Sequence, residues 1–219
     1  MTDVRENCRR VLERIHNAAA KSGRDPSSIQ LIAVTKKVSV EKIREAVAAG
    51  ISHIGENRLQ EALPKREALT DVPLTWHFIG HLQTNKAKKA AEQFDWIQCV
   101  DRPELAEKLN QAAPKALPVL IEVKLHDEPM KSGVTEQQLR GFIEQFSRWT
   151  QLDLRGLMAI PPLFENPEEV RPYFRRLRLL AEEHHLGELS MGMSNDFEVA
   201  IEEGATMVRV GTALFGERK

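Results

Sequence analysis

One lysine of the sequence stands where an α/β protein would carry a reactive group. Lys36 ends the apolar run of residues 29–36, which follows the turn residues 25–28. A short, continuous, β-branched run of this kind predicts a strand that is buried on both faces. Ligands of parallel α/β proteins bind at the carboxyl ends of the strands. Lys36 is therefore either a lysine leaving the core for solvent or a half-buried amine available for Schiff-base chemistry.

A second group of residues predicts an anion site. Ser194 lies in the segment 192–195, which opens directly into a predicted helix, and Gly211 and Thr212 follow the last predicted strand. The loops after the last two strands of a barrel commonly bind phosphate, and the N–H groups at helix starts favour anions. Each glycine alone could be an ordinary turn residue, but their paired placement favours phosphate.

Arg209 is a charged residue inside the predicted strand 207–210. It shares one face of that strand with Met207, so its side chain is expected to point into the interior of the fold. A buried arginine needs a partner. That partner is either a strand-end carboxylate such as Glu56 or an acceptor on a bound ligand.

Three further candidates come from strand ends and one polar loop. Asn57 follows the second predicted strand, and His77 lies in the third, where it could equally be a core histidine. Lys131 lies in the polar loop 127–133. That loop is a plain connection, a mobile lid or a second lysine site.

Alternating strand and helix patterns supply the elements that would bring these residues together. The predicted strands are residues 29–36, 53–56, 74–79, 96–100, 118–124, 154–160, 188–191 and 207–210. The predicted helices are residues 2–22 before the first strand, and then 39–49, 57–69, 84–94, 103–113, 136–150, 168–185 and 196–203. Eight such units predict an α/β fold closed into a single TIM (β/α)8 barrel, with a doubly wound open sheet as the alternative.

The N-terminal helix is extra to that barrel. We expect it to pack outside the sheet or to close the bottom of the barrel, and we expect one domain over residues 1–219. Length and composition agree with a single large core, because the chain has 219 residues of which 42% are hydrophobic.

Charge and cysteine content narrow the classes of partner. The formal net charge of −1 gives no basic field for nucleic acid or an anionic membrane. Cys8 and Cys99 are far apart, which fits neither a disulfide framework nor a metal site and favours a reducing, cytoplasmic setting. No segment is long and apolar enough to cross a bilayer. We expect a monomer.

A Schiff-base lysine that shares one mouth with a phosphate site suggests two chemistries. One is a barrel aldolase acting on a sugar phosphate. The other is a protein that holds pyridoxal 5'-phosphate (PLP), whose aldehyde would react with the lysine and whose phosphate would occupy the anion site.

Motifs along most of the chain decide between these chemistries. They are Ala33-Val-Thr-Lys36, Gly55-Glu-Asn57, Trp76-His-Phe-Ile-Gly-His-Leu-Gln83 with Asn85-Lys86, Lys131-Ser-Gly133, Gly156-Leu-Met158, Gly192-Met-Ser-Asn-Asp196 and Val208-Arg-Val-Gly-Thr212, continuing to Phe215-Gly216. In order and spacing they resemble the pyridoxal phosphate homeostasis proteins, from about residue 30 to the end of the chain.

The resemblance implies a barrel like the N-terminal domain of bacterial alanine racemase. PLP would be held as a Schiff base on Lys36. Its phosphate would be bound by Ser194 and by the backbone of Gly211 and Thr212.

The resemblance also implies the surroundings of the cofactor ring. Asn57 and His77 would line it, and Arg209 would face the pyridine nitrogen. A cation there opposes protonation of the ring and so weakens it as an electron sink. Lys131 would be a second lysine that meets PLP transiently.

The implied function is intracellular PLP homeostasis or delivery, with a role in amino- and keto-acid balance and with little or no enzymatic turnover. Apo PLP-dependent enzymes would be the recipients. A racemase needs an acid/base on each face of the substrate carbon, and in the two-domain enzymes the second one comes with a separate domain. We expect no such domain here. A racemase-like enzyme and a Schiff-base aldolase remain the alternatives.

Overall fold

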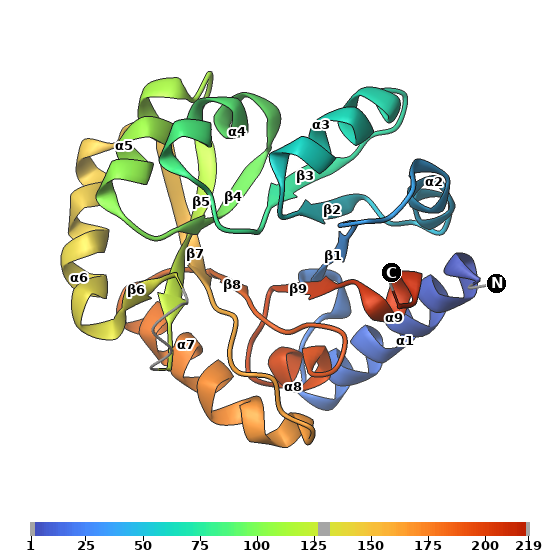
Figure 1. Ribbon diagram of the computed structural model, residues 1–219. Helices are drawn as coiled ribbons and strands as arrows, with labels where there is room; N and C mark the ends of the chain where they lie inside the picture. Colours follow the sequence, from blue (N-terminus) through green and yellow to red (C-terminus); the bar gives the residue numbers. More distant parts are fainter. Residues whose placement is uncertain (1–2, 127–131, 218–219) are drawn as a thin grey trace.

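Eight parallel strands close into a barrel in the computed structural model, which describes residues 3–126 and 132–217 (Figure 1). Their order is β4-β3-β2-β1-β9-β8-β7-β5, and β4 also pairs with β5, which closes the sheet. The strands are β1 (Gln30–Val34), β2 (His53–Glu56), β3 (Thr75–Phe78), β4 (Trp96–Val100), β5 (Leu117–Lys124), β7 (Leu152–Met158), β8 (Glu188–Ser190) and β9 (Met207–Val210). The predicted TIM barrel is confirmed, and the open sheet is excluded.

A ninth strand was not expected from the sequence. β6 (Val134–Thr135) is only two residues long and pairs with the carboxyl end of β5. It leads directly into the helix after it, whose start is stabilised by a capping box of Thr135 and Gln138.

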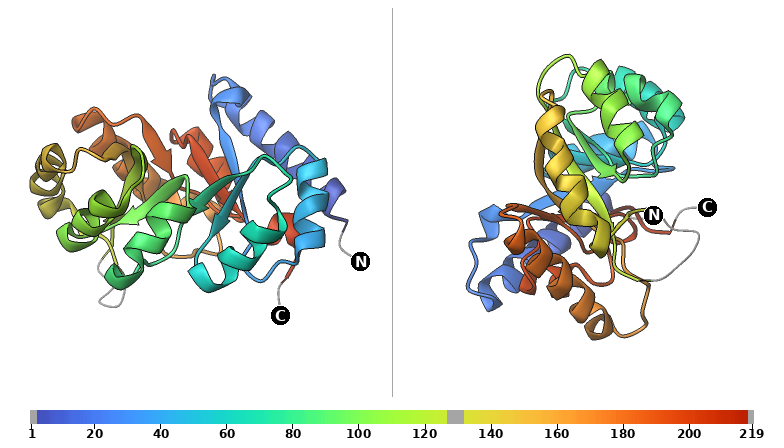
Figure 2. Two further views of the ribbon diagram at one scale, coloured as in Figure 1. Left: turned by 90° about the horizontal axis from the view of Figure 1, so that it is seen from above. Right: turned by 90° about the vertical axis from the view of Figure 1, so that its left-hand side faces the viewer.

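The helices surround the barrel, as Figures 1 and 2 show. They are α1 (Val4–Lys21), α2 (Val40–Ala48), α3 (Leu59–Ala68), α4 (Ala87–Gln93), α5 (Pro103–Ala112), α6 (Glu136–Glu144), α7 (Arg171–Glu183), α8 (Phe197–Glu202) and α9 (Thr212–Phe215). Among the described helices, none is long and apolar enough to cross a membrane.

Several predicted helices were wrong in extent. The predictions 84–94 and 136–150 contain 3-10 turns at residues 84–86 and 145–148, and the prediction 168–185 overlaps one at residues 167–170, so the α-helical part is shorter in each. At α7 the cause is Pro172, which lacks an N–H group and is accommodated only in the first turn of a helix. The short helix α9, which follows the last strand, was not predicted.

Helix α1 packs on the outside of the barrel. It lies against α8, α9 and α2 (Figure 1), and its buried stripe includes Val4, Cys8, Val11 and Ile15. Asn7 Nδ2 donates to the carbonyl oxygen of Leu214 at 3.0 Å. Of the two positions expected for this helix, the structure has the one outside the sheet.

Gly192 fixes the path of the chain from β8 to α8. Its φ of +89° lies in the left-handed region, which residues with a Cβ atom rarely adopt. A Cβ atom at this position would also lie 2.5 Å from Cβ of Ala200. A residue other than glycine would push α8 away from the strand end, and this turn carries Ser194 toward the mouth of the barrel.

Candidate functional site

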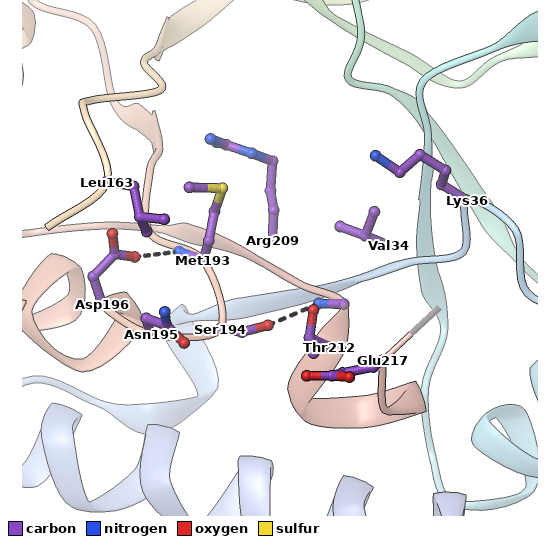
Figure 3. Close-up of a pocket in the computed structure, with 11 residues that line it drawn as sticks. Val34, Lys36, Leu163, Met193, Ser194, Asn195, Asp196, Arg209, Thr212 and Glu217 are labelled. Atoms are coloured by element: carbon purple, nitrogen blue, oxygen red, sulfur yellow. Dashed lines mark hydrogen bonds between the residues drawn. The ribbon is translucent and has the colours of Figure 1, made fainter. Parts of the chain in front are cut away.

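A cavity of about 630 Å³ opens at the carboxyl ends of β1, β8 and β9 (Figure 3). A volume of this size is typical of small-molecule sites. Residues from the end of β1, the loop after β7 and the last part of the sequence line it. They are Val34, Lys36, Leu163, Met193, Ser194, Asn195, Asp196, Arg209, Gly211, Thr212 and Glu217. Five of the predicted site residues, from Lys36 to Thr212, therefore lie in one cavity.

Lys36 enters this cavity from the end of β1. Val34 and Lys36 share one face of the strand and both line the cavity, whereas the intervening Thr35 is fully buried and donates to Glu56 Oε1 at 2.7 Å. Figure 3 shows the Lys36 side chain reaching across the cavity with its amine directed toward Arg209. Lys36 is half-buried, which agrees with the second of the two alternatives drawn from the sequence.

A buried ion pair holds the backbone next to Lys36. Lys65 Nζ lies 2.7 Å from Glu56 Oε1 and donates to the carbonyl oxygen of Thr35, also at 2.7 Å. Both partners are largely excluded from water, with side-chain exposures of 12% and 0%. Lys65 therefore joins α3 to the carbonyl group next to Lys36, and removal of either partner would leave an uncompensated buried charge.

Ser194 organises the anion-binding side of the cavity. Its Oγ accepts hydrogen bonds from the N–H groups of Gly211 (3.3 Å) and Ala213 (3.2 Å). A hydroxyl has two acceptor positions and one donor proton, so these bonds leave the Ser194 proton for a ligand. The hydroxyl of Thr212 and the amide of Asn195 line the same region. This donor set suits an anion such as phosphate.

Arg209 is almost fully buried, at 4% exposure, beneath the centre of the cavity. Its Nη1 donates to Ser190 Oγ at 2.7 Å, and its Nη2 donates to the carbonyl oxygen of Ala159 at 2.9 Å. Burial lowers the pKa of this guanidinium to about 10, against the opposing field of Glu122 and Asp196, so it stays charged at neutral pH. The ion pair with Glu56 considered from the sequence is not formed, because Glu56 pairs with Lys65.

The other predicted site residues do not line this cavity. Asn57 lines a neighbouring cavity between α3 and the loop after β3. His77 is fully buried inside the barrel and bonds to His53 and Gln98. Lys131 lies outside the described residues.

A second cavity of about 680 Å³ occupies the other side of the mouth, at the ends of β4 and β5. Glu122 lines it at 9% exposure, with Ser132 Oγ donating to its carboxylate at 3.3 Å. Burial, reinforced by the nearby charge of Asp101, raises the pKa of Glu122 to about 7. Arg102 pairs with Asp101, while the hydrogen bond from Ser132 and the field of Arg209 oppose the rise in the Glu122 pKa.

Three residues that shape the site were missed from the sequence. Ser190 holds Arg209, Gln98 holds Ser190, and Glu122 carries a titratable charge at the mouth. Each is a polar residue inside a predicted apolar strand. That signal was available, because buried polar groups require partners.

The fold and the cavity define a class of protein. The chain matches the family model "Alanine racemase, N-terminal domain" over residues 5–219. The alanine racemase of Corynebacterium glutamicum has the same fold, with a TM-score of 0.74 at 21% identity, and the match covers 98% of this chain and 61% of that one. The chain is thus a barrel of the alanine racemase N-terminal class.

Closer relatives define the family within that class. The chain is 48% identical to the pyridoxal phosphate homeostasis protein of Aquifex aeolicus, over 98% of each sequence. It is 44% identical to PipY of Synechococcus elongatus, solved with PLP bound, with a TM-score of 0.83 over 94% of this chain and 100% of that one. The chain belongs to the pyridoxal phosphate homeostasis protein family, and the resemblance seen in its motifs is confirmed.

The raised pKa of Glu122 predicts a pH-dependent stability. Between its ordinary pKa of 4.5 and about 7, the folded protein binds a proton that the unfolded chain has lost, so stability falls as pH rises through this window. Gln at this position does not titrate. We therefore expect the free energy of unfolding of Glu122→Gln, relative to that of the unsubstituted protein, to be about 2–3 kcal/mol higher at pH 8 than at pH 4.5. Urea unfolding at both pH values measures this difference. Glu45→Gln, on the exposed face of α2, is the control, and a gain equal to that of the control would contradict the prediction.

Proposed function

We propose that this protein binds PLP in the cavity at the ends of β1, β8 and β9, and that it acts in PLP homeostasis or delivery. The observation that carries the proposal is that the Lys36 amine, the Arg209 guanidinium and the hydroxyl of Ser194 line one cavity. The names of its relatives support the proposal, as does the PLP-bound structure of PipY.

The residues present fit three polar groups of this cofactor, which are its aldehyde, its phosphate and its ring nitrogen. Lys36 would hold the aldehyde carbon as a Schiff base. The hydroxyls of Ser194 and Thr212 and the backbone near Gly211 would hold the phosphate. When bound, PLP supplies an electron-accepting ring to amines.

Arg209 would limit that chemistry. Its guanidinium is fixed by Ser190 and by the carbonyl oxygen of Ala159, and it remains charged. A fixed cation beside the ring nitrogen opposes protonation of the ring. This supports a carrier of PLP, with no turnover of its own, that passes the cofactor to apo enzymes. Asn57 and Lys131 remain proposed contacts of PLP, whereas His77 would act on the cavity through other side chains. A cytoplasmic monomer is part of the same proposal.

The covalent role of Lys36 is tested by substitution. We expect Lys36→Ala to lose the visible absorbance of the PLP-loaded protein and its capture by borohydride, because the amine that forms the bond is gone. Lys37→Ala is the matched control, since Lys37 is the next residue along the chain and is exposed. If the band persists in Lys36→Ala, the attachment lies at another lysine, and Lys131 is the next to substitute.

The role of Ser194 is tested with two forms of the ligand. We expect Ser194→Ala to weaken PLP binding about tenfold to a hundredfold, the usual effect of losing a hydrogen bond to a charged group. Binding of pyridoxal, which lacks the phosphate, should change little. Equilibrium titrations of both ligands measure this, with the exposed Ser28→Ala as control. If Ser194→Ala weakens the binding of PLP and of pyridoxal equally, Ser194 does not bind the phosphate.

A racemase-like enzyme is the alternative, and the fold it shares with alanine racemase favours it. Purified, PLP-loaded protein is expected to give no interconversion of D- and L-alanine above that of free PLP, because racemisation needs an electron-accepting ring and the fixed Arg209 cation would oppose its protonation. Sustained turnover abolished by Lys36→Ala would establish the enzyme instead.

A colourless protein that borohydride traps onto a sugar phosphate would establish an aldolase.

A further inference from the structure

A chain of buried polar side chains crosses the barrel interior behind the candidate cavity. It links residues of five strands through four hydrogen bonds: His53 Nδ1 to His77 Nε2 (3.0 Å), His77 Nδ1 to Gln98 Nε2 (3.0 Å), Gln98 Oε1 to Ser190 Oγ (2.7 Å), and Ser190 Oγ to Arg209 Nη1 (2.7 Å). β4 and β8 are not neighbours in the barrel. The bond between Gln98 and Ser190 therefore passes through the interior.

The direction of the chain follows from its Arg209 end. A guanidinium only donates, so Ser190 Oγ must accept from Arg209. The one proton of the Ser190 hydroxyl then goes to Gln98, which must present its carbonyl oxygen. The amide nitrogen of Gln98 consequently faces His77 Nδ1, and it also donates to Met207 Sδ at 3.4 Å.

The same logic assigns the tautomers of both histidines. His77 Nδ1 accepts from the Gln98 amide, so its ring proton lies on Nε2. That proton is donated to His53 Nδ1, which must be unprotonated. Burial lowers the pKa of His77 to about 3, so its ring is neutral at pH 7. Burial also lowers the pKa of His53, with the field of Asp95 opposing it.

Burial of the chain makes it energetically costly to reverse the donors and acceptors of these hydrogen bonds. His77, Gln98 and Ser190 are 0% exposed, so no solvent replaces a lost partner. A buried donor or acceptor left unpaired is expensive, and a reversed Gln98 amide would set its N–H groups against Ser190 and leave the hydroxyl proton without that acceptor.

We propose that Ser190, Gln98 and His77 are positioning residues, which hold the Arg209 guanidinium in one orientation beneath the cavity through this one-directional chain. Arg209 sets the direction because it is the only member that can never accept. The tautomers and the orientation of Arg209 belong to the protein alone, and only the consequence for a bound cofactor rests on the proposed function. His77 thus acts on the cavity through Gln98 and Ser190.

The histidine tautomers are measured by ¹⁵N NMR of the imidazole rings in the full chain, freed of cofactor. We expect His77 in the form protonated on Nε2, with Nδ1 bare. His77 protonated on Nδ1 would overturn the proposal without any substitution, so this arm does not depend on the folding of a variant.

Gln98→Glu tests whether residue 98 dictates the tautomer. An ionised carboxylate cannot donate to His77 Nδ1, so the proton of His77 should move to Nδ1 in this nearly isosteric variant at a pH where the carboxyl ¹³C shift shows residue 98 to be ionised. Gln151→Glu, on an exposed residue, should leave His77 unchanged. An unchanged His77 beside an ionised residue 98 in folded Gln98→Glu would overturn the proposal.

Ser190→Ala tests the effect on Arg209. In the unsubstituted protein the Arg209 side-chain N–H signal should exchange slowly with water, and in Ser190→Ala it should exchange at least tenfold faster. The exposed Ser147→Ala is the control. Equal exchange in both variants would show that the chain does not position Arg209. If the exchange and tautomer results are as expected but PLP fails to bind, only the proposed function is wrong.

Discussion

The parallel pairing of β1 with β9 is the contact on which the candidate site depends. It places Ile32 opposite Arg209 and Ala33 opposite Val210, so the first and last strands of the barrel end side by side. Lys36 and the Gly211–Thr212 turn then lie on one rim, although they are far apart in sequence. Pairing of β4 with β5 closes the sheet and makes this placement obligatory, since a closed barrel has no free edge at which the two strands could separate.

The polar groups of the interior are arranged so that each charge has a different kind of partner. Glu56 and Lys65 form a direct buried ion pair that anchors the backbone before Lys36. Arg209 instead bonds to a hydroxyl and a carbonyl oxygen, with Glu122 and Asp196 acting through their fields. A guanidinium held by neutral groups keeps its charge available to a ligand, whereas one in a direct ion pair would have it largely neutralised. This difference suits Arg209 to a role at the ligand and Lys65 to a structural one.

Local sequence predicted the elements well and their ends less well. All eight barrel strands were located, because buried parallel strands are short apolar runs between turn residues. The predicted strand at residues 154–160 was placed two residues too late, since its register is set by pairing of Leu152 with Leu117 rather than by local pattern. The two-residue strand β6 is too short to leave a pattern, and the 3-10 turns depend on packing around the helix ends.

By itself, the sequence determined the class of fold, the family motifs and the chemical types at the strand ends. It identified Lys36, Ser194, Arg209, Gly211 and Thr212, which the structure brings to one cavity, because alternation along a strand and glycine at its end are local signals. Only the tertiary structure decided that His77 lies inside the barrel and that Asn57 lines a neighbouring cavity. The partner of Arg209 was decided there too. Which side chains meet across a closed barrel depends on the stagger of non-adjacent strands, and no local pattern records it.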